Sequence, residues 1–136
     1  RALWLGFIPA SRTIPHRTGN ELYSVQIFPS GYFESFSPET LFEKWAAVKV
    51  EKNDTIPENM ELLKIPEGWY AVFHYRGPAG DPAIFEYIFR QWLPISGFDL
   101  DARPHFEILG EKYKNEGPDS EEEIWIPVKE KALASK

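Results

Sequence analysis

The chain has 136 residues, with 21 acidic and 15 basic side chains, a formal net charge of −6 and no cysteine. This length suits one domain with one hydrophobic core, and the acidic balance argues against direct contact with nucleic acid, which needs clustered Lys and Arg. The lack of cysteine excludes disulfides and thiol nucleophiles, and no apolar run reaches the roughly 20 residues of a membrane span. We therefore expect a cytoplasmic protein that does not contact a membrane.

The first part of the chain predicts one helix and two strands. Residues 1–8 are apolar on every side and indicate the end of a helix that stops at Pro9. Apolar and polar residues alternate over 21–28, which predicts a strand, and residues 29–40 are rich in turn formers. The segment 41–50 is ambiguous between helix and strand, and its valine-rich end favours a strand.

A connector follows these elements. Residues 53–67 contain two prolines, scattered charges and several apolar side chains, so we expect a segment that packs against the rest of the domain. Within it, the string MELLKI predicts a strand.

The remainder predicts strand, helix, strand and strand. The β-branched and aromatic run at 68–75 is typical of a strand, and Pro82 suits the start of a helix that runs to Leu93 and ends at a proline. The string SGFDLDAR is predicted to be a loop. Strands are predicted over 104–109 and 121–129, and in the second one Ile124, Ile126 and Val128 share a face opposite Glu123, Trp125 and Pro127.

The order of these elements suggests an internal duplication. The string WAAVK near the end of the first half matches WIPVK near the end of the second, and ELYSVQ matches PHFEIL. We predict an α+β fold in which duplicated strand-helix-strand-strand units form a pseudo-two-fold antiparallel sheet, with two helices and a central cleft. The expected single domain comprises a first repeat at 1–52 that lacks its opening strand, a connector at 53–67, a second repeat at 68–129 and a tail at 130–136. Because the chain starts with Arg1 rather than Met, we expect that strand to precede the sequence.

The sequence contains no motif for a metal or cofactor. No two of the three histidines have metal-ligand spacing, and there is no GxSxG sequence or glycine-rich phosphate loop. We therefore expect neither a metal nor a cofactor.

Glu107 stands out because it is ionisable within an apolar strand. By alternation it points with His105 and Leu109, away from Phe106 and Ile108. The simpler interpretation is a solvated outer face. The functional interpretation is a carboxylate that is held among aromatic rings, where it binds a cation or keeps a proton.

Aromatic residues make up 15% of the chain, and most of them suit core packing. Trp45 and Trp125 fall on strands next to that of Glu107 or its repeat counterpart, so we predict an aromatic box with the acid at its floor. The acidic run at 121–123 is interpreted as the solvated start of the last strand.

Three strings together resemble a known family: GWYAVFHYRG, WLPISGFDLDARPHFEILGEKY and SEEEIWIPV. They are similar to the GyrI-like small-molecule-binding family, which includes the effector-binding domains of bacterial AraC-type and MerR-type transcription regulators. The resemblance implies the duplicated fold and an aromatic-walled cleft with a glutamate, which matches Glu107. It also implies the stand-alone or excised form, because the chain has no room for a DNA-binding domain.

The leading hypothesis is a binding module for small hydrophobic, often cationic or aromatic molecules, as in multidrug binding. The predicted ligand-binding residues are Glu107, Trp125, Trp92, Tyr23 and Trp45. One alternative is a hydrolase for strained, cyclopropane-type electrophiles, in which Glu107 is catalytic and either Tyr70 or Tyr113 assists it. Another is a protein-interaction module, such as a topoisomerase inhibitor. The ligand and the oligomeric state stay open.

Overall fold

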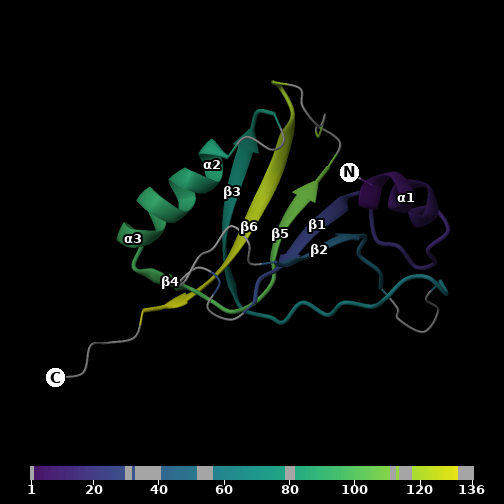
Figure 1. Ribbon diagram of the computed structural model, residues 1–136, viewed down its shortest axis with the longest axis horizontal. Helices are drawn as coiled ribbons and strands as arrows, with labels where there is room; N and C mark the ends of the chain where they lie inside the picture. The colour runs from purple at the N-terminus through teal and green to yellow at the C-terminus, as the bar shows by residue number, and fades with distance from the viewer. Residues whose placement is uncertain are drawn as a thin grey trace.

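The computed structural model describes residues 2–29, 32, 41–51, 57–78, 82–110, 113 and 118–131. Their strands form a six-stranded antiparallel sheet in the order β2-β1-β5-β6-β3, and β4 pairs with an end of β6 (Figure 1). In chain order the elements are α1 (Ala2–Ser11), β1 (Leu22–Ile27), β2 (Glu43–Ala47), β3 (Trp69–Arg76), α2 (Ala83–Glu86), η1 (Tyr87–Trp92), α3 (Leu93–Ile95), β4 (Phe98–Leu100), β5 (His105–Leu109) and β6 (Glu121–Glu130). The predicted α+β fold is confirmed.

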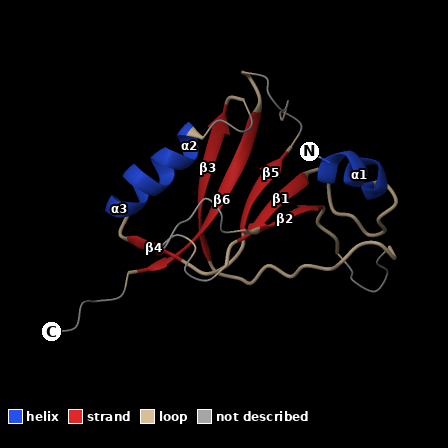
Figure 2. Cartoon of the chain, viewed as in Figure 1, coloured by secondary structure: helices blue, strands red, loops and turns tan. Residues whose placement is uncertain are grey.

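The core lies between β3, β6 and the second helical segment. On β6, Ile124, Ile126 and Val128 are buried against Ile88, which is 0% exposed. The predicted division of β6 into two faces is therefore correct. In Figure 2 this helical segment runs along β3 and β6, whereas α1 lies at the opposite end of the sheet, next to β2.

The second helical segment is continuous from α2 through η1 to α3, and η1 has π-helical winding. Pro94 has no N–H to donate to the carbonyl one turn earlier, and its ring disfavours regular α-helical winding there. The wider π turn directly precedes it. The helix nevertheless continues to Ile95, so the prediction that it ends before Pro94 was wrong by two residues.

Three other predictions also differ from the structure. Helix α1 passes through Pro9 to Ser11, whose Oγ donates to the carbonyl of Ile8 at 2.7 Å. The string SGFDLDAR contains β4, because the long strand β6 extends far enough to pair with it. MELLKI forms no strand, since this segment lies over one face of the sheet rather than along an edge. The predicted turns at 29–40 fall largely outside the described residues.

The strand order has an approximate two-fold relation about the central pair of β1 and β5. Val25 pairs with Phe106 across this centre, and these two residues pair outward with Trp45 and Trp125, respectively. Trp45 and Trp125 therefore occupy equivalent positions, in agreement with the match of WAAVK to WIPVK. The predicted match of ELYSVQ to PHFEIL aligns Phe106 with Tyr23 instead of Val25. It is therefore shifted by two residues relative to the pairing in the structure. The repeat boundaries stay a prediction.

Candidate functional site

The two faces of the sheet carry different side chains. Glu107 pairs with Ile124, so its side chain shares the face that the helices cover, whereas Phe106 pairs with Trp125 on the other face. A cavity lies on each face. We call them the acidic cavity, on the face of Glu107, and the aromatic cavity, on the face of Trp125.

The acidic cavity has a volume of about 350 Å³ and lies between the two helical regions. Trp4 from α1 and Phe85 from α2 line it from different ends of the sheet. The polar lining residues are Ser24, Gln26, Lys44, Glu107 and Glu122. The aromatic ones are Trp4, Phe28, Phe42, Phe85 and Tyr113. Strands β1, β2, β5 and β6 thus supply an acidic floor, and aromatic rings surround it.

Both carboxyl groups of this cavity are harder to ionise than usual. Burial raises the pKa of Glu107, although the charge of Lys44 and a hydrogen bond from Gln26 oppose the shift. Burial and then the negative charge of Glu107 raise the pKa of Glu122 to about 7. Among the described residues, no Lys or Arg forms an ion pair with either group. The cavity is therefore a site where added positive charge would be stabilised.

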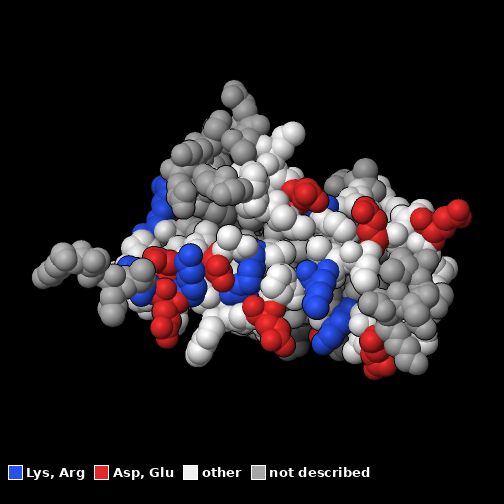
Figure 3. All heavy atoms as spheres, turned by 90° about the horizontal axis from the view of Figure 1, so that it is seen from below, with Lys and Arg blue, Asp and Glu red and all other residues white. Residues whose placement is uncertain are grey.

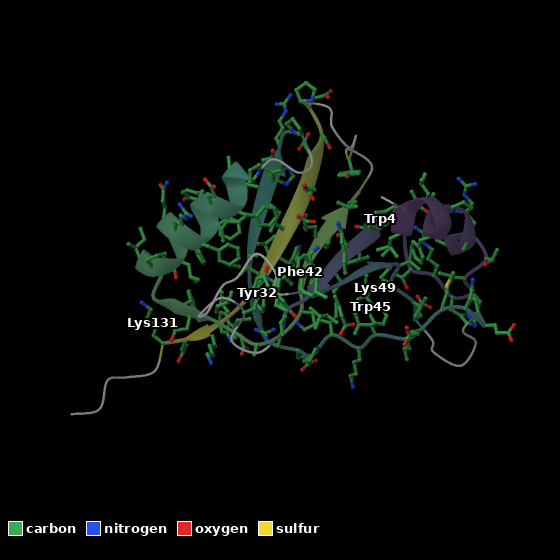
Figure 4. The ribbon with its side chains drawn as sticks, in the orientation of Figure 1. Trp4, Tyr32, Phe42, Trp45, Lys49 and Lys131 are labelled. Carbon is green, nitrogen blue, oxygen red and sulfur yellow. The ribbon has the colours of Figure 1, made fainter. Side chains whose placement is uncertain are left out.

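One wall of the acidic cavity, formed by Phe28 and Phe42, is part of a larger cluster of rings. The ring centroids of Phe28 and Phe42 are 4.8 Å apart, as are those of Phe28 and Tyr32. Figure 4 labels Tyr32 and Phe42 together in front of the strands. His105 also contacts Phe28 at 4.8 Å, and burial lowers the pKa of His105 to about 4, so its ring is neutral at pH 7. This wall is uncharged and offers ring faces to a ligand.

The aromatic cavity, with a volume of about 1610 Å³, lies between the opposite face of the sheet and residues 57–68. Trp125 stacks on Phe106 with centroids 5.2 Å apart, and Tyr70 meets both rings edge-on. The guanidinium carbon of Arg103 lies 4.5 Å from the centroid of the Tyr70 ring. A cation of the protein itself therefore already occupies one ring face here.

Two glutamates of this face accept hydrogen bonds from tryptophan side chains. Trp125 Nε1 donates to Glu123 Oε1 at 3.0 Å, and the equivalent Trp45 Nε1 donates to Glu43 Oε1 at 3.3 Å. Each tryptophan thus contacts a glutamate two residues earlier on its own strand. These hydrogen bonds fix the orientation of both indole rings.

Comparison with known proteins identifies the family. The model of the Cass2 family, described as integron-associated effector binding protein, matches residues 19–128. The chain belongs to the Cass2 family. This agrees with the predicted resemblance to GyrI-like proteins.

A relative of the chain is a transcriptional regulator. The chain is 26% identical over 129 residues to the transcriptional regulator BrlR of Pseudomonas aeruginosa. The match covers 93% of this Cass2-family chain and 45% of the relative. The chain thus spans less than half the length of that regulator.

The structure separates the residues predicted to form one binding site. Tyr23, Trp45 and Trp125 line the aromatic cavity, whereas Glu107 lines the acidic one. Trp92 lines neither of these cavities and packs edge-on against Phe73, with centroids 5.0 Å apart. The predicted box of Glu107 beneath Trp45 and Trp125 is wrong, because strand register places the acid and these rings on opposite faces. Whether the rings contact a ligand stays a prediction.

The most informative residue missed in the sequence is Glu122. The interpretation of residues 121–123 as a solvated strand start is wrong for this residue, which is 9% exposed. Alternation with Ile124 and Ile126 would have indicated its face, but not that helical side chains cover it. The rings of Trp4, Phe28, Phe42 and Phe85 were also missed as wall residues, since they come from distant segments.

Within the described ranges, no group of three or more His, Cys, Asp or Glu is arranged to hold a metal ion. No helix in that part of the chain is long and apolar enough to cross a membrane.

Proposed function

We propose that this chain binds small cationic molecules with aromatic or apolar groups in the acidic cavity. The observation that carries the proposal is Glu107, a largely buried carboxylate in a cavity surrounded by rings, which has no ion-pair partner among the described residues. A bound cation would offset the cost of burying this charge, and it would also interact with the ring faces. Small-molecule sites typically measure about 300–1,000 Å³, a range that includes this cavity.

The comparisons support this proposal at a coarser level. Membership of an effector-binding family and similarity to a transcriptional regulator indicate small-molecule binding. We further propose that the bound molecule acts as an effector for transcription regulation, with tolerance for several ligands of this type. The face seen in Figure 3 mixes acidic and basic side chains. The described residues visible on this face therefore form no continuous acidic patch.

The proposal can be tested with two ligands of the same shape. Benzyltrimethylammonium carries a permanent positive charge, and neopentylbenzene is its neutral carbon isostere. We expect calorimetry to show tighter binding of the cation to the unmodified chain. Glu107→Gln keeps the side-chain size but removes the charge, so it should weaken cation binding about tenfold or more without weakening binding of the isostere. Equal affinity of the unmodified chain and Glu107→Gln for the cation would contradict the proposal.

One observation favours the hydrolase as a second candidate. Tyr113 lines the acidic cavity with Glu107, whereas the alternative partner Tyr70 lines the aromatic cavity. A carboxylate and a phenol in one aromatic-walled cavity suit general acid-base chemistry. Incubation with a strained cyclopropane electrophile tests it, since turnover should require both Glu107 and Tyr113 but not Tyr70. Turnover no faster than in buffer would remove this candidate.

A further inference from the structure

Glu122 is a second carboxyl group in the acidic cavity. Because Glu107 pairs with Ile124 on β6, Glu122 lies two residues along that strand on the same face. Such diagonal neighbours are about 7–8 Å apart between their Cα atoms. The two carboxyl groups therefore reach the cavity from adjacent strands, and the negative charge of Glu107 contributes to the raised pKa of Glu122.

In the part of the chain that the structure describes, no cationic side chain pairs with Glu122 to balance its charge. Glu122 is nine-tenths buried, and its side chain makes no hydrogen bond or ion pair among the described residues. Lys44 and Gln26 both act on Glu107 instead. A buried carboxyl group that faces a cavity without a partner can be satisfied by a proton or by a cationic group of a ligand.

We propose that Glu122 makes the acidic cavity selective for molecules that carry two positive charges. This inference rests on the proposed function, in which Glu107 binds the first charge. The second charge of the ligand pairs with Glu122, which loses its proton to solvent as the ligand binds. The ligand class is an aromatic or apolar compound with two separated basic or quaternary nitrogen groups.

The ionisable groups around Glu122 come from several strands. They are Glu107 on β5, Lys44 on β2, Tyr75 opposite Glu122 on β3, and Tyr113 after β5. His105 is neutral near pH 7 because burial lowers its pKa. Glu122, with a pKa of about 7, is expected to change charge between pH 6 and pH 8. Below pH 7 it is protonated, so the advantage of a second positive charge should shrink as the pH falls.

The test compares benzyltrimethylammonium with p-xylylenebis(trimethylammonium), which carries a second permanent charge on the same ring. At pH 8 we expect the unmodified chain to bind the dication at least about tenfold more tightly, and this ratio to decrease at pH 6. Glu122→Gln should reduce the ratio to about twofold, the statistical value for a symmetric ligand, at both pH values. Glu123→Gln, on the same strand but the opposite face, is the matched control and should keep the full ratio.

The outcomes separate this inference from the function on which it rests. Binding of the monocation that depends on Glu107, combined with a dication ratio that Glu122→Gln does not change, would overturn only the role of Glu122. Loss of the dependence on Glu107, or binding of neither ligand, would overturn both. Proton release on dication binding, measured by calorimetry in buffers of different ionisation enthalpy, provides a test in the unmodified chain. Greater proton release at pH 6.5 with the dication than with the monocation is the expected result, and equal release would contradict it.

Discussion

The acidic and aromatic cavities lie on opposite faces of one sheet, and glutamate side chains have different partners on the two faces. On the aromatic face, Glu43 and Glu123 accept hydrogen bonds from indole N–H groups, and Arg103 already lies over Tyr70. On the acidic face, Glu107 and Glu122 have raised pKa values and no ion-pair partner among the described residues. The difference indicates that the charged groups beside the tryptophans of the aromatic face already have protein partners, while the acidic face is arranged to receive a charge.

The largest expected effect separates stability from binding. Trp125 packs on Phe106 and Tyr70, so Trp125→Ala should lower the free energy of unfolding by about 3 kcal/mol. It should change the affinity for benzyltrimethylammonium less than twofold. Trp4→Ala, in the wall of the acidic cavity, should weaken cation binding with a smaller loss of stability. Urea unfolding measures the stability of both variants, and calorimetry measures their affinity for the cation. A loss of cation affinity in Trp125→Ala but not in Trp4→Ala would contradict the assignment of binding to the acidic face.

The buried acid should make stability depend on pH. The pKa of Glu122 rises from 4.5 to about 7 on folding, so the folded state holds a proton that the unfolded state has lost. Its contribution therefore becomes less favourable as the pH rises from about 4.5 to 7, by on the order of 2–3 kcal/mol. Relative to the unmodified chain, Glu122→Gln should gain stability between pH 5 and pH 8. Urea titrations at the two pH values measure this gain.

The control for that experiment is Glu123→Gln on the opposite face. Its stability should follow that of the unmodified chain at both pH values. A gain of stability at pH 8 that is equal in Glu122→Gln and Glu123→Gln would show that the effect comes from net charge rather than from the acidic cavity.

His105 should have the opposite pH dependence. Burial lowers its pKa from 6.5 to about 4, so the unfolded state takes up a proton first as the pH falls. Stability should decrease from pH 6.5 to pH 4 by on the order of 2 kcal/mol because of this residue. His105→Gln should lose less stability than the unmodified chain over the same range. An equal loss in both proteins, measured by urea unfolding, would contradict a buried neutral imidazole.

The smallest expected effect concerns the two equivalent tryptophans. Glu123→Ala removes the acceptor of Trp125 Nε1 and should cost about 0.5–1 kcal/mol of stability. Glu43→Ala should cost less, because its hydrogen bond to Trp45 is longer and exposed. Neither change should alter cation affinity. A tenfold loss of affinity in either variant would place the ligand on the aromatic face instead.

The alternation of residues within each strand could be predicted from the sequence. Which residues of different strands line the same cavity could not be predicted. Alternation correctly separated Glu107 from Phe106 and Ile124 from Trp125. Whether Trp125 shares a face with Glu107 depends on register between β5 and β6, a tertiary property that periodicity does not determine. The rings beside Glu107 come from α1, α2 and the segments next to β1 and β2, so their proximity also depends on the complete fold.

The central claim is that the acidic cavity, rather than the aromatic one, receives the cation. Side-chain indole N–H signals in a two-dimensional NMR spectrum test it directly, because Trp4 lines the acidic cavity and both Trp45 and Trp125 line the aromatic one. In Figure 4, Trp4 belongs to α1 and Trp45 to the neighbouring strand β2. Titration with benzyltrimethylammonium should shift the Trp4 signal in a saturable manner and leave those of Trp45 and Trp125 in place. Saturable shifts of Trp45 and Trp125 with an unchanged Trp4 signal would contradict the claim.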